Sequence, residues 1–253
     1  MEKKALIAMS GGVDSSVAAL LCQQQGFDCM GITLALTDNE DRGIPREKTC
    51  CSVDDVADAR SVAFRLGMPF YVFNFKDAFR REVMDRFVQD YEQGRTPNPC
   101  VDCNRYIKFG KLMARGEEIG YPYVATGHYA RVEQDPDTGR WLLKKGLDPQ
   151  KDQSYMLYAL TQWELSRLLL PLGGLTKDQV RQLAEEHGFV NARKRDSQDI
   201  CFVPDGDYAG FIRRWTGHDF PPGEFVGTQG EVFGQHKGPM HHPVGQRKGL
   251  GLS

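Results

Sequence analysis

Short apolar runs alternate with longer stretches of helical periodicity over the first half of the chain. Each apolar run is bounded by charged or turn-forming residues, which is typical of strands buried in a parallel sheet. These runs cover residues 4–9, 29–36, 70–74 and 123–126. Between them, apolar residues recur at helical spacing in residues 13–25, 54–66, 79–93 and 107–119. The alternation predicts an α/β fold, a parallel sheet with helices on both faces, whose ligand lies beyond the carboxyl ends of the strands.

The pattern changes after the last predicted strand. Residues 130–133 and 141–145 flank the turn sequence Asp135-Pro-Asp-Thr-Gly139, which predicts a hairpin. Thr176-Lys-Asp-Gln179 has the spacing of a capping box, so we expect a helix that begins there and ends near Gly188.

From Pro204 onward the chain is rich in glycine and aromatic residues, with short pieces of strand-like sequence. We therefore predict two units. The first is a larger α/β domain over residues 1–203, and the second is a small β-rich module over residues 204–253. We expect this module to be incomplete at its end.

Residues 10–16 read Ser-Gly-Gly-Val-Asp-Ser-Ser and stand between the first predicted strand and the first predicted helix. The glycines let the backbone turn tightly and approach a ligand, and the first N–H groups of a helix have no partner within it. Such a loop favours an anion, above all phosphate. It is neither a Walker A loop, which requires a lysine, nor a Gly-x-Gly-x-x-Gly dinucleotide loop. An ordinary glycine-rich turn is the alternative.

Seven cysteines without regular spacing indicate a reducing compartment, and we expect a cytoplasmic protein with thiol or metal chemistry. Cys100 and Cys103 form a C-x-x-C motif, which we expect on a proline-led loop, and Cys201 lies far along the chain. Such a motif serves as a redox pair, as half of a zinc site or as cluster ligands. A second C-x-x-C for a zinc site is missing, because Cys50 and Cys51 are adjacent.

The composition excludes some classes of protein. Hydrophobic content of 40% and charged content of 26% are ordinary for a globular protein, and no apolar run approaches the ~20 residues of a membrane span. The first residues, Met1-Glu-Lys-Lys, do not resemble a signal peptide. A net charge of −2 does not by itself indicate nucleic-acid binding, but a local basic stripe is compatible with it. Basic residues near the C-x-x-C motif are Arg80, Arg81, Arg95, Arg105, Lys108, Lys111 and Arg115.

The Ser-Gly-Gly heptapeptide resembles the pyrophosphate loop of the ATP pyrophosphatase superfamily, which includes GMP synthetase, NAD synthetase, argininosuccinate synthetase and the tRNA thiolases. Further motifs follow in a fixed order: Asn98-Pro99, Cys103-Asn104, Lys108-Phe109, Thr126–Tyr129, Lys151–Tyr155, Asp196–Phe202 and Gly245–Gly249. As an ordered set over the whole chain, they resemble the tRNA-uridine 2-sulfurtransferase family, the tRNA-specific 2-thiouridylases. The resemblance implies an adenine nucleotide alpha hydrolase-like domain. Family members continue with a C-terminal β-barrel, which is absent from this chain.

The resemblance implies ATP-dependent tRNA thiolation. The family adenylates the C2 carbonyl oxygen of a wobble uridine, releases pyrophosphate and replaces the oxygen with sulfur, giving 2-thiouridine. Adenylation is required because oxide is a poor leaving group, whereas AMP leaves readily. N–H donors and Mg²⁺, held by Asp14, would stabilise charge on the phosphates. The implied ATP-binding residues are Ala8, Met9, Ser10, Gly11, Gly12, Val13, Asp14, Ser15, Ser16, Leu34 and Gly127, with the last two on the adenine side.

The resemblance also implies roles for the cysteines. Cys201 receives sulfur as a persulfide, and Cys103 attacks it or assists its release. The two thiols would approach each other and could form a disulfide when oxidised. The sulfur donor would be a persulfide carrier protein or free sulfide. The implied tRNA-binding residues are Asn98, Pro99 and Cys100 at the target base, together with Lys151, Asp152 and Gln153.

Cys100 departs from the family pattern, because many members carry aspartate there. If Cys100, Cys103 and Cys201 meet, three thiolates could hold a 4Fe–4S cluster with one iron open for exogenous sulfide, as in related cluster-dependent tRNA thiolases. Two other interpretations stay open. One is an amidotransferase-like pyrophosphate-loop synthetase that adenylates a small acceptor. The other is an ATP-binding sensor or RNA-binding scaffold without turnover.

Overall fold

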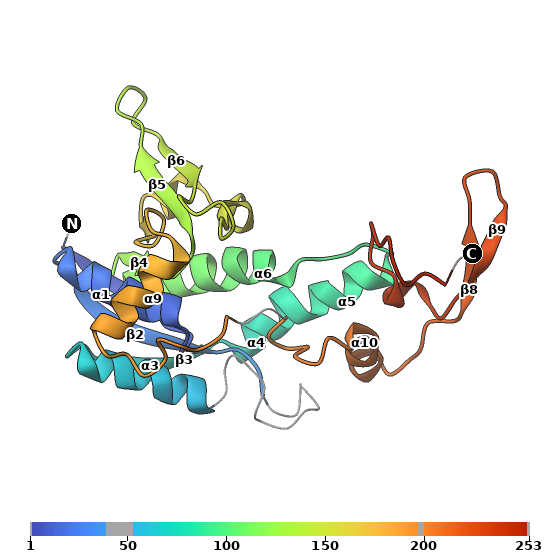
Figure 1. Cartoon of the computed structure of the whole chain (residues 1–253), viewed down its shortest axis with the longest axis horizontal. Coiled ribbons are helices and arrows are strands. Elements are labelled where there is room, and N and C mark those ends of the chain that lie inside the picture. Colours follow the sequence, from blue (N-terminus) through green and yellow to red (C-terminus); the bar gives the residue numbers. More distant parts are fainter. Residues whose placement is uncertain (1, 39–52, 197–199, 252–253) are drawn as a thin grey trace.

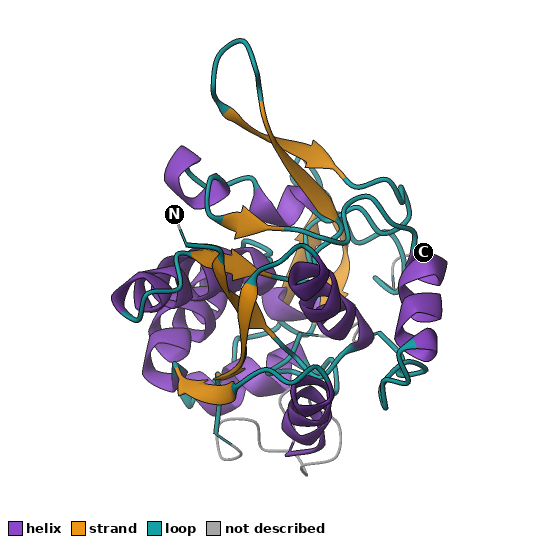
Figure 2. Cartoon of the chain, turned by 90° about the vertical axis from the view of Figure 1, so that its left-hand side faces the viewer, coloured by secondary structure: helices purple, strands orange, loops and turns teal. Residues whose placement is uncertain are grey.

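The computed structural model describes residues 2–38, 53–196 and 200–251. The chain forms an α/β body at one end, from which a long helical arm leads to a small β module at the other end (Figure 1). A hairpin stands out from the body, far from the small β module (Figure 1), and projects from the body in the turned view as well (Figure 2). Within the described residues, no helix has the length and apolar character needed to cross a membrane.

The body is built on a parallel sheet in which the described residues contribute five strands, in the order β3-β2-β1-β4-β7. The strands are β1 (Lys4–Ala8), β2 (Asp28–Ala35), β3 (Phe70–Asn74), β4 (Tyr123–Ala125) and β7 (Leu168–Leu169). The four predicted strands are confirmed, each within about a residue or two. The strand β7 was not predicted, because two residues carry no periodicity. The chain leaves β1 first toward β2 and later returns on its other side as β4, so the carboxyl end of β1 is a topological switch point.

Helices cover both faces of this sheet, as predicted. One face is covered by α1 (Val13–Gln24), α3 (Val53–Arg65) and α9 (Lys177–Glu186). The other face is covered by a long broken helix and by the helix that carries Cys103. Side chains of β1 alternate between the two cores, with Leu6 in one and Ala5 and Ile7 in the other. Both faces are therefore buried, as expected for a parallel sheet.

The two helices on the second face begin earlier than predicted, at residues 76 and 99 and not at 79 and 107, and they end within one residue of their predicted ends. The first runs through α4 (Lys76–Phe79), the π-helical segment η2 (Arg80–Met84) and α5 (Asp85–Glu92). The second runs through α6 (Pro99–Asp102), the π-helical segment η3 (Cys103–Lys111) and α7 (Leu112–Glu118). Our prediction of a loop around the C-x-x-C motif is wrong. Asn98 caps the helix by accepting a hydrogen bond from the Cys100 N–H, and Pro99 occupies the first turn, so the motif lies inside a helix.

The remaining elements lie around the body and along the arm. The hairpin comprises β5 (Ala130–Gln134) and β6 (Trp141–Lys145), and it is followed by η4 (Ser154–Leu157) and α8 (Gln162–Leu165). The end module comprises α10 (Tyr208–Thr216), the hairpin strands β8 (Gly223–Val226) and β9 (Val232–His236), and η5 (Pro239–His241). The predicted hairpin and capping-box helix are confirmed.

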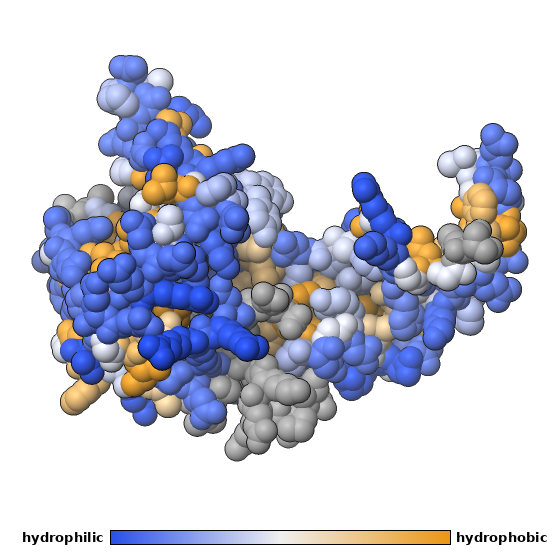
Figure 3. Space-filling view, in the orientation of Figure 1, coloured by the Kyte–Doolittle hydropathy of each residue, from blue (hydrophilic) through white to orange (hydrophobic). Residues whose placement is uncertain are grey.

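The helix α10 was not expected in a β-rich module. It packs against the arm through aromatic contacts, with ring centroids 6.0 Å apart for Phe211 and Phe87 and 5.1 Å apart for Phe211 and Phe202. The same cluster thus joins residues on both sides of the predicted boundary at 203/204, and that boundary stays a prediction. Figure 3 shows apolar surface on the end module, whose exposed apolar residues include Val226 of β8 and Val232 and Phe233 of β9.

Candidate functional site

The Ser-Gly-Gly loop, residues 10–16, lies at the carboxyl end of β1 and at the start of α1. Gly11 has a φ of 79°, which favours glycine, and a Cβ atom there would overlap the carbonyl oxygen of Asp55. Both the backbone conformation and the lack of space therefore require glycine at this position. The carbonyl of Gly12 accepts hydrogen bonds from the hydroxyls of Ser15 at 3.0 Å and Ser16 at 3.1 Å. No side chain caps the start of α1. The loop, hereafter the phosphate loop, is therefore a preorganised anion site.

A lysine that is distant in the sequence pairs with the carboxylate of this loop. Lys177 donates to both carboxylate oxygens of Asp14, at 2.7 and 2.8 Å, and the hydroxyl of Tyr129 donates to the same carboxylate at 2.8 Å. Burial, and then the Asp14 carboxylate, raise the pKa of Tyr129, so the phenol remains a donor. Sequence reasoning missed Lys177, since no motif connects it to a position 163 residues earlier.

The position of Lys177 is not explained by the stability of its own helix. It is the first residue of α9, where a positive charge opposes the helix dipole, and only 7% of the residue is exposed. The helix start is already satisfied by a reciprocal capping box between Thr176 and Gln179. The buried ammonium of Lys177 is instead paired with the carboxylates of Asp14 and Asp196.

The same lysine links the phosphate loop to the segment that leads to Cys201. Its ammonium also lies 2.7 Å from Asp196 Oδ1, while Asp196 Oδ2 accepts from Lys151 at 2.8 Å. Burial alone would raise the pKa of Asp196, but the hydrogen bonds from Lys151 and Lys177 outweigh it and lower that pKa. We call Asp14, Tyr129, Lys151, Lys177 and Asp196 the lysine–carboxylate network.

Asn191 binds the phosphate loop directly. It is almost fully buried, and its amide donates to the Gly11 carbonyl and the Ser16 hydroxyl, both at 2.9 Å. Its Oδ1 has no hydrogen-bond partner among the described residues. Nearby, Lys194 donates to Asp55 and Asp58 at 2.6 Å each. Residues after α9 therefore brace the loop, which sequence reasoning also missed.

The other predicted nucleotide residues lie at the same edge of the sheet. Ala8 and Met9 end β1 and lead into the loop, and Leu34 is buried near the end of β2. A Cβ atom on Gly127 would lie 2.8 Å from the carbonyl carbon of Asp14, so the segment after β4 touches the start of α1. The structure brings these residues together as the sequence suggested.

Beside them, His128 is buried. Its Nδ1 lies 2.7 Å from the Thr126 hydroxyl. Burial, and then the charge of Lys108, lower the pKa of His128 well below its usual value. The imidazole is therefore neutral at physiological pH.

The cysteines form a second region, which we call the thiol region: Cys100, Cys103 and Cys201. Cys103 is 8% exposed and belongs to the core on the second face of the sheet, and half-buried Cys201 packs against that core. The residue after it, Phe202, contacts Phe79 of the long helix at 5.8 Å between ring centroids. Both predicted catalytic thiols therefore lie on the same face of the sheet.

The structure does not bring the thiols together as a metal site. No group of three or more His, Cys, Asp or Glu side chains that could hold a metal ion is present among the described residues, which include all three of these cysteines. Cys100 is exposed whereas Cys103 is buried. The predicted cluster site is therefore not formed by these residues as they stand. Cys50 and Cys51 lie outside the described residues.

The predicted tRNA-binding residues come from two segments in contact. Asn98, Pro99 and Cys100 form the start of α6, and η4, which follows Lys151–Gln153, packs against α6 and η3. Asp152 accepts from the Gly146 N–H at 2.8 Å and from the Ser154 hydroxyl at 2.9 Å. Gln153 Oε1 accepts from the Tyr129 N–H at 3.1 Å. Asp152 and Gln153 thus shape their own segment.

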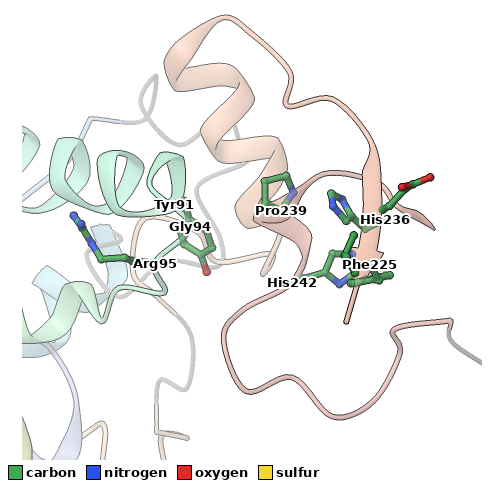
Figure 4. A pocket seen from close by; sticks show the side chains of 9 residues that line it. Tyr91, Gly94, Arg95, Phe225, His236, Pro239 and His242 are labelled. Atoms are coloured by element: carbon green, nitrogen blue, oxygen red, sulfur yellow. The ribbon is translucent and has the colours of Figure 1, made fainter. Parts of the chain in front are cut away.

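A pocket of about 250 Å³ lies elsewhere, between the end of α5 and the end module. Figure 4 shows Tyr91, Gly94 and Arg95 on one side and residues of the module on the other, Phe225, Pro239, His236 and His242. It lies toward the opposite end of the long axis from α1 (Figure 1). It is therefore separate from the phosphate loop and the thiol region.

Comparisons with known proteins identify the family. Residues 3–205 match the family model described as tRNA methyl transferase HUP domain, and residues 209–253 match tRNA methyl transferase PRC-barrel domain. A tRNA-specific 2-thiouridylase of Clostridioides difficile is 49% identical over 100% of this chain and 70% of its own length. One from Carboxydothermus hydrogenoformans is 52% identical over 99% of this chain and 69% of its own length.

Among solved structures, the chain is similar to a 4-thiouridine synthetase in a complex with RNA and bound ATP. The sequence identity is 20% and the TM-score 0.46, over 80% of this chain and 45% of that chain. The family model over residues 3–205 and the curated relatives that match nearly the whole chain show that the chain belongs to the tRNA-specific 2-thiouridylase family.

Proposed function

We propose that this chain is an ATP-dependent tRNA-uridine 2-sulfurtransferase, which converts a uridine of tRNA to 2-thiouridine. The observation that carries the proposal is the lysine–carboxylate network. It ties the phosphate loop, through Lys177 and Asp196, to the segment that leads to Cys201. Membership of the family, with relatives about half identical over the whole chain, supports the same reaction. A cytoplasmic location remains a prediction from the cysteine content.

The first step is adenylation. The C2 carbonyl oxygen of uridine attacks the α-phosphorus of ATP, and pyrophosphate leaves with the electron pair of the broken P–O bond. Negative charge on the phosphates would be met by the N–H groups at the start of α1 and by the ammonium of Lys177, which is already held at Asp14. Tyr129 would keep the Asp14 carboxylate in place.

Asp14 also suits the predicted magnesium ion. A carboxylate offers about four acceptor positions, and Lys177 and Tyr129 occupy three of them. One position is left for a hard cation, which is consistent with Mg²⁺ that takes one carboxylate and otherwise uses phosphates and water. When bound, Mg²⁺ would neutralise charge on the β- and γ-phosphates. The described residues offer no three-ligand metal site, and magnesium at a triphosphate does not require one.

The second step is sulfur transfer, for which we favour the persulfide route. The terminal sulfur of a persulfide on Cys201 attacks C2, and AMP leaves with the electron pair of the C–O bond. The Cys103 thiolate then attacks Cys201 Sγ, which releases the thiocarbonyl and leaves a disulfide between the two cysteines. A persulfide carrier protein is the donor. The burial of Cys103 in the core against which Cys201 packs supports this route.

The test is mass analysis of nucleosides from tRNA incubated with this chain, ATP, Mg²⁺ and a persulfide donor. We expect 2-thiouridine in the wild-type reaction and one pyrophosphate released for each thiolated uridine. Pyrophosphate release with a small acceptor and without tRNA would instead support the synthetase interpretation, and ATP binding without turnover would support the sensor.

The cluster route needs its own test. Anaerobic purification followed by iron and sulfide determination should give a colourless protein that thiolates tRNA after treatment with a chelator. Stoichiometric iron that is lost in a Cys100→Asp variant would overturn the persulfide route while leaving the overall reaction intact.

A further inference from the structure

The short helix η4 and the residue that follows it present two tyrosines to solvent. Tyr155 is 56% exposed and Tyr158 is 71% exposed, whereas Leu157 between them is 1% exposed and belongs to the core. In a 3₁₀ helix, side chains three residues apart eclipse one another. Tyr158 directly follows η4 and keeps helical backbone angles, with φ of −59° and ψ of −24°. The two rings therefore lie on one side of the segment, while the leucine anchors its other side.

The two tyrosines lie beside the elements that carry the predicted target-base residues and Cys103. The helix η4 packs against α6, which begins with the predicted target-base residues, and against η3, which begins with Cys103. The segment just before it is also held in place, since Lys151 bonds to Asp196 and the Gln153 N–H donates to the Tyr129 carbonyl at 2.9 Å. The tyrosines thus sit on a braced support beside the proposed reaction centre.

The charge around the pair favours a polyanion. The neighbouring η3 carries three cations, Arg105, Lys108 and Lys111, and its sequence holds no carboxylate. None of these three cations forms an ion pair with another described residue under the usual distance limit. Exposed aromatic rings beside cations are the combination that binds single-stranded nucleic acid, with stacking on bases and contacts to phosphates.

We propose that Tyr155 and Tyr158 form a stacking platform for unpaired bases of the RNA loop that carries the target uridine. The proposal rests on the proposed function and adds to it the residues that hold the flanking bases. Every base has a π-face, so the platform is tolerant of base identity. It would hold the loop while the target uridine reaches α6, and it would orient this nucleotide without touching the reacting atoms.

Binding of a stem-loop RNA with an unpaired loop tests the platform. We expect Tyr155→Leu and Tyr158→Leu each to raise the Kd roughly tenfold, and the double variant to raise it further. Tyr→Phe or Tyr→Trp at the same positions should keep the affinity near wild type, because these rings stack as well. Since stacking releases no counterions, the slope of log Kd against log salt should stay unchanged in all variants.

Tyr71→Leu is the matched control, because Tyr71 is 53% exposed on β3 and lies outside η4, α6 and η3. Thermal melting of each variant checks that folding is intact, as expected for exposed positions. An unchanged Kd in the double leucine variant, with a wild type that thiolates tRNA, would refute the platform alone. Normal RNA binding with lost affinity for a persulfide carrier would show a protein-docking surface instead. Absence of thiolation by the wild type would refute the underlying function.

Discussion

The phosphate loop and the thiol region lie in one domain but are built in opposite ways. The phosphate loop is surrounded by charged and polar contacts, among them the bond from Lys177 to Asp14 and the bonds from Asn191 to Gly11 and Ser16. In the thiol region, Cys103 lies in an apolar core formed by helices, and Cys201 packs against that core. These contacts of the phosphate loop are charged or polar, whereas the core in which Cys103 lies and against which Cys201 packs is apolar.

This difference matches the demands of the two proposed steps. Charge develops on phosphates during adenylation, so donors and cations must be in place beforehand. Sulfur transfer depends instead on thiols that change their bonding partners. Asp196, which bonds to Lys177, precedes Cys201 by five residues in the sequence.

The largest expected effect is a loss of tRNA thiolation without a loss of pyrophosphate release. Cys103→Ser and Cys201→Ser should each lower the rate of tRNA thiolation on the order of 10³-fold or more, because a hydroxyl cannot replace the thiol as nucleophile or sulfur carrier. ATP-dependent release of pyrophosphate with tRNA should stay near the wild-type rate for the first turnover. Both products can be measured in one reaction, with Cys22→Ala, a buried cysteine on the other face, as the control. If pyrophosphate release fell as much as thiolation in these variants, adenylation could not be assigned to the phosphate loop and sulfur transfer to the cysteines.

The second prediction acts on the phosphate loop. Lys177→Met should lower the rate of pyrophosphate release by roughly 10²- to 10³-fold, as for removal of one preorganised donor. Thiolation should fall in proportion because it depends on the adenylated intermediate. Lys145→Met, at an exposed position on the hairpin, is the control and should have little effect. An active Lys177→Met enzyme would mean that the network serves folding only.

The third prediction concerns the close approach of two backbones. Gly127→Ala places a methyl group 2.8 Å from the carbonyl carbon of Asp14 and 2.9 Å from the Ser15 nitrogen, so the start of α1 must shift. We expect a loss of about 1–3 kcal/mol in the free energy of unfolding and a raised KM for ATP. Denaturant titration and initial rates measure the two effects. Gly174→Ala should change neither, since a Cβ there meets nothing within 4 Å.

The smallest expected effect is a dependence of stability on pH. Burial lowers the pKa of His128 in the folded protein, while the unfolded chain has the ordinary value of about 6.5. Below that pH the unfolded state binds a proton that the folded state does not. The free energy of unfolding should therefore fall by up to about 1.4 kcal/mol per pH unit as pH drops below 6.5, and be unaffected by this residue above it.

His128→Gln should remove this component of the pH dependence, as measured by denaturant titration between pH 7 and pH 5. The exposed His241→Gln should leave the dependence unchanged. An identical slope in wild type and His128→Gln would mean that His128 is protonated in the folded state.

Local patterns were enough to predict four strands of the parallel sheet, the Ser-Gly-Gly loop and the capping box at Thr176, because each is encoded by adjacent residues. The start of α6 was predicted wrongly, since Asn98-Pro99 reads as a break in a proline-rich stretch and equally as a cap with proline in the first turn. Lys177 and Asn191 could not be found from the sequence, because their roles arise only when α9 and the following segment pack against α1.

The bonds from Asn191 to the phosphate loop also bear on how the protein is made. Asn191 lies 180 positions from Gly11 and 175 positions from Ser16 in the sequence, and it must meet both before the Gly11 carbonyl and the Ser16 hydroxyl gain this partner. The Ser-Gly-Gly segment is synthesised early, and it can gain its bonds to Asn191 only after most of the domain has emerged from the ribosome. The nucleotide cradle is thus finished late in biosynthesis, so competence to bind ATP reports that the domain has folded as a whole.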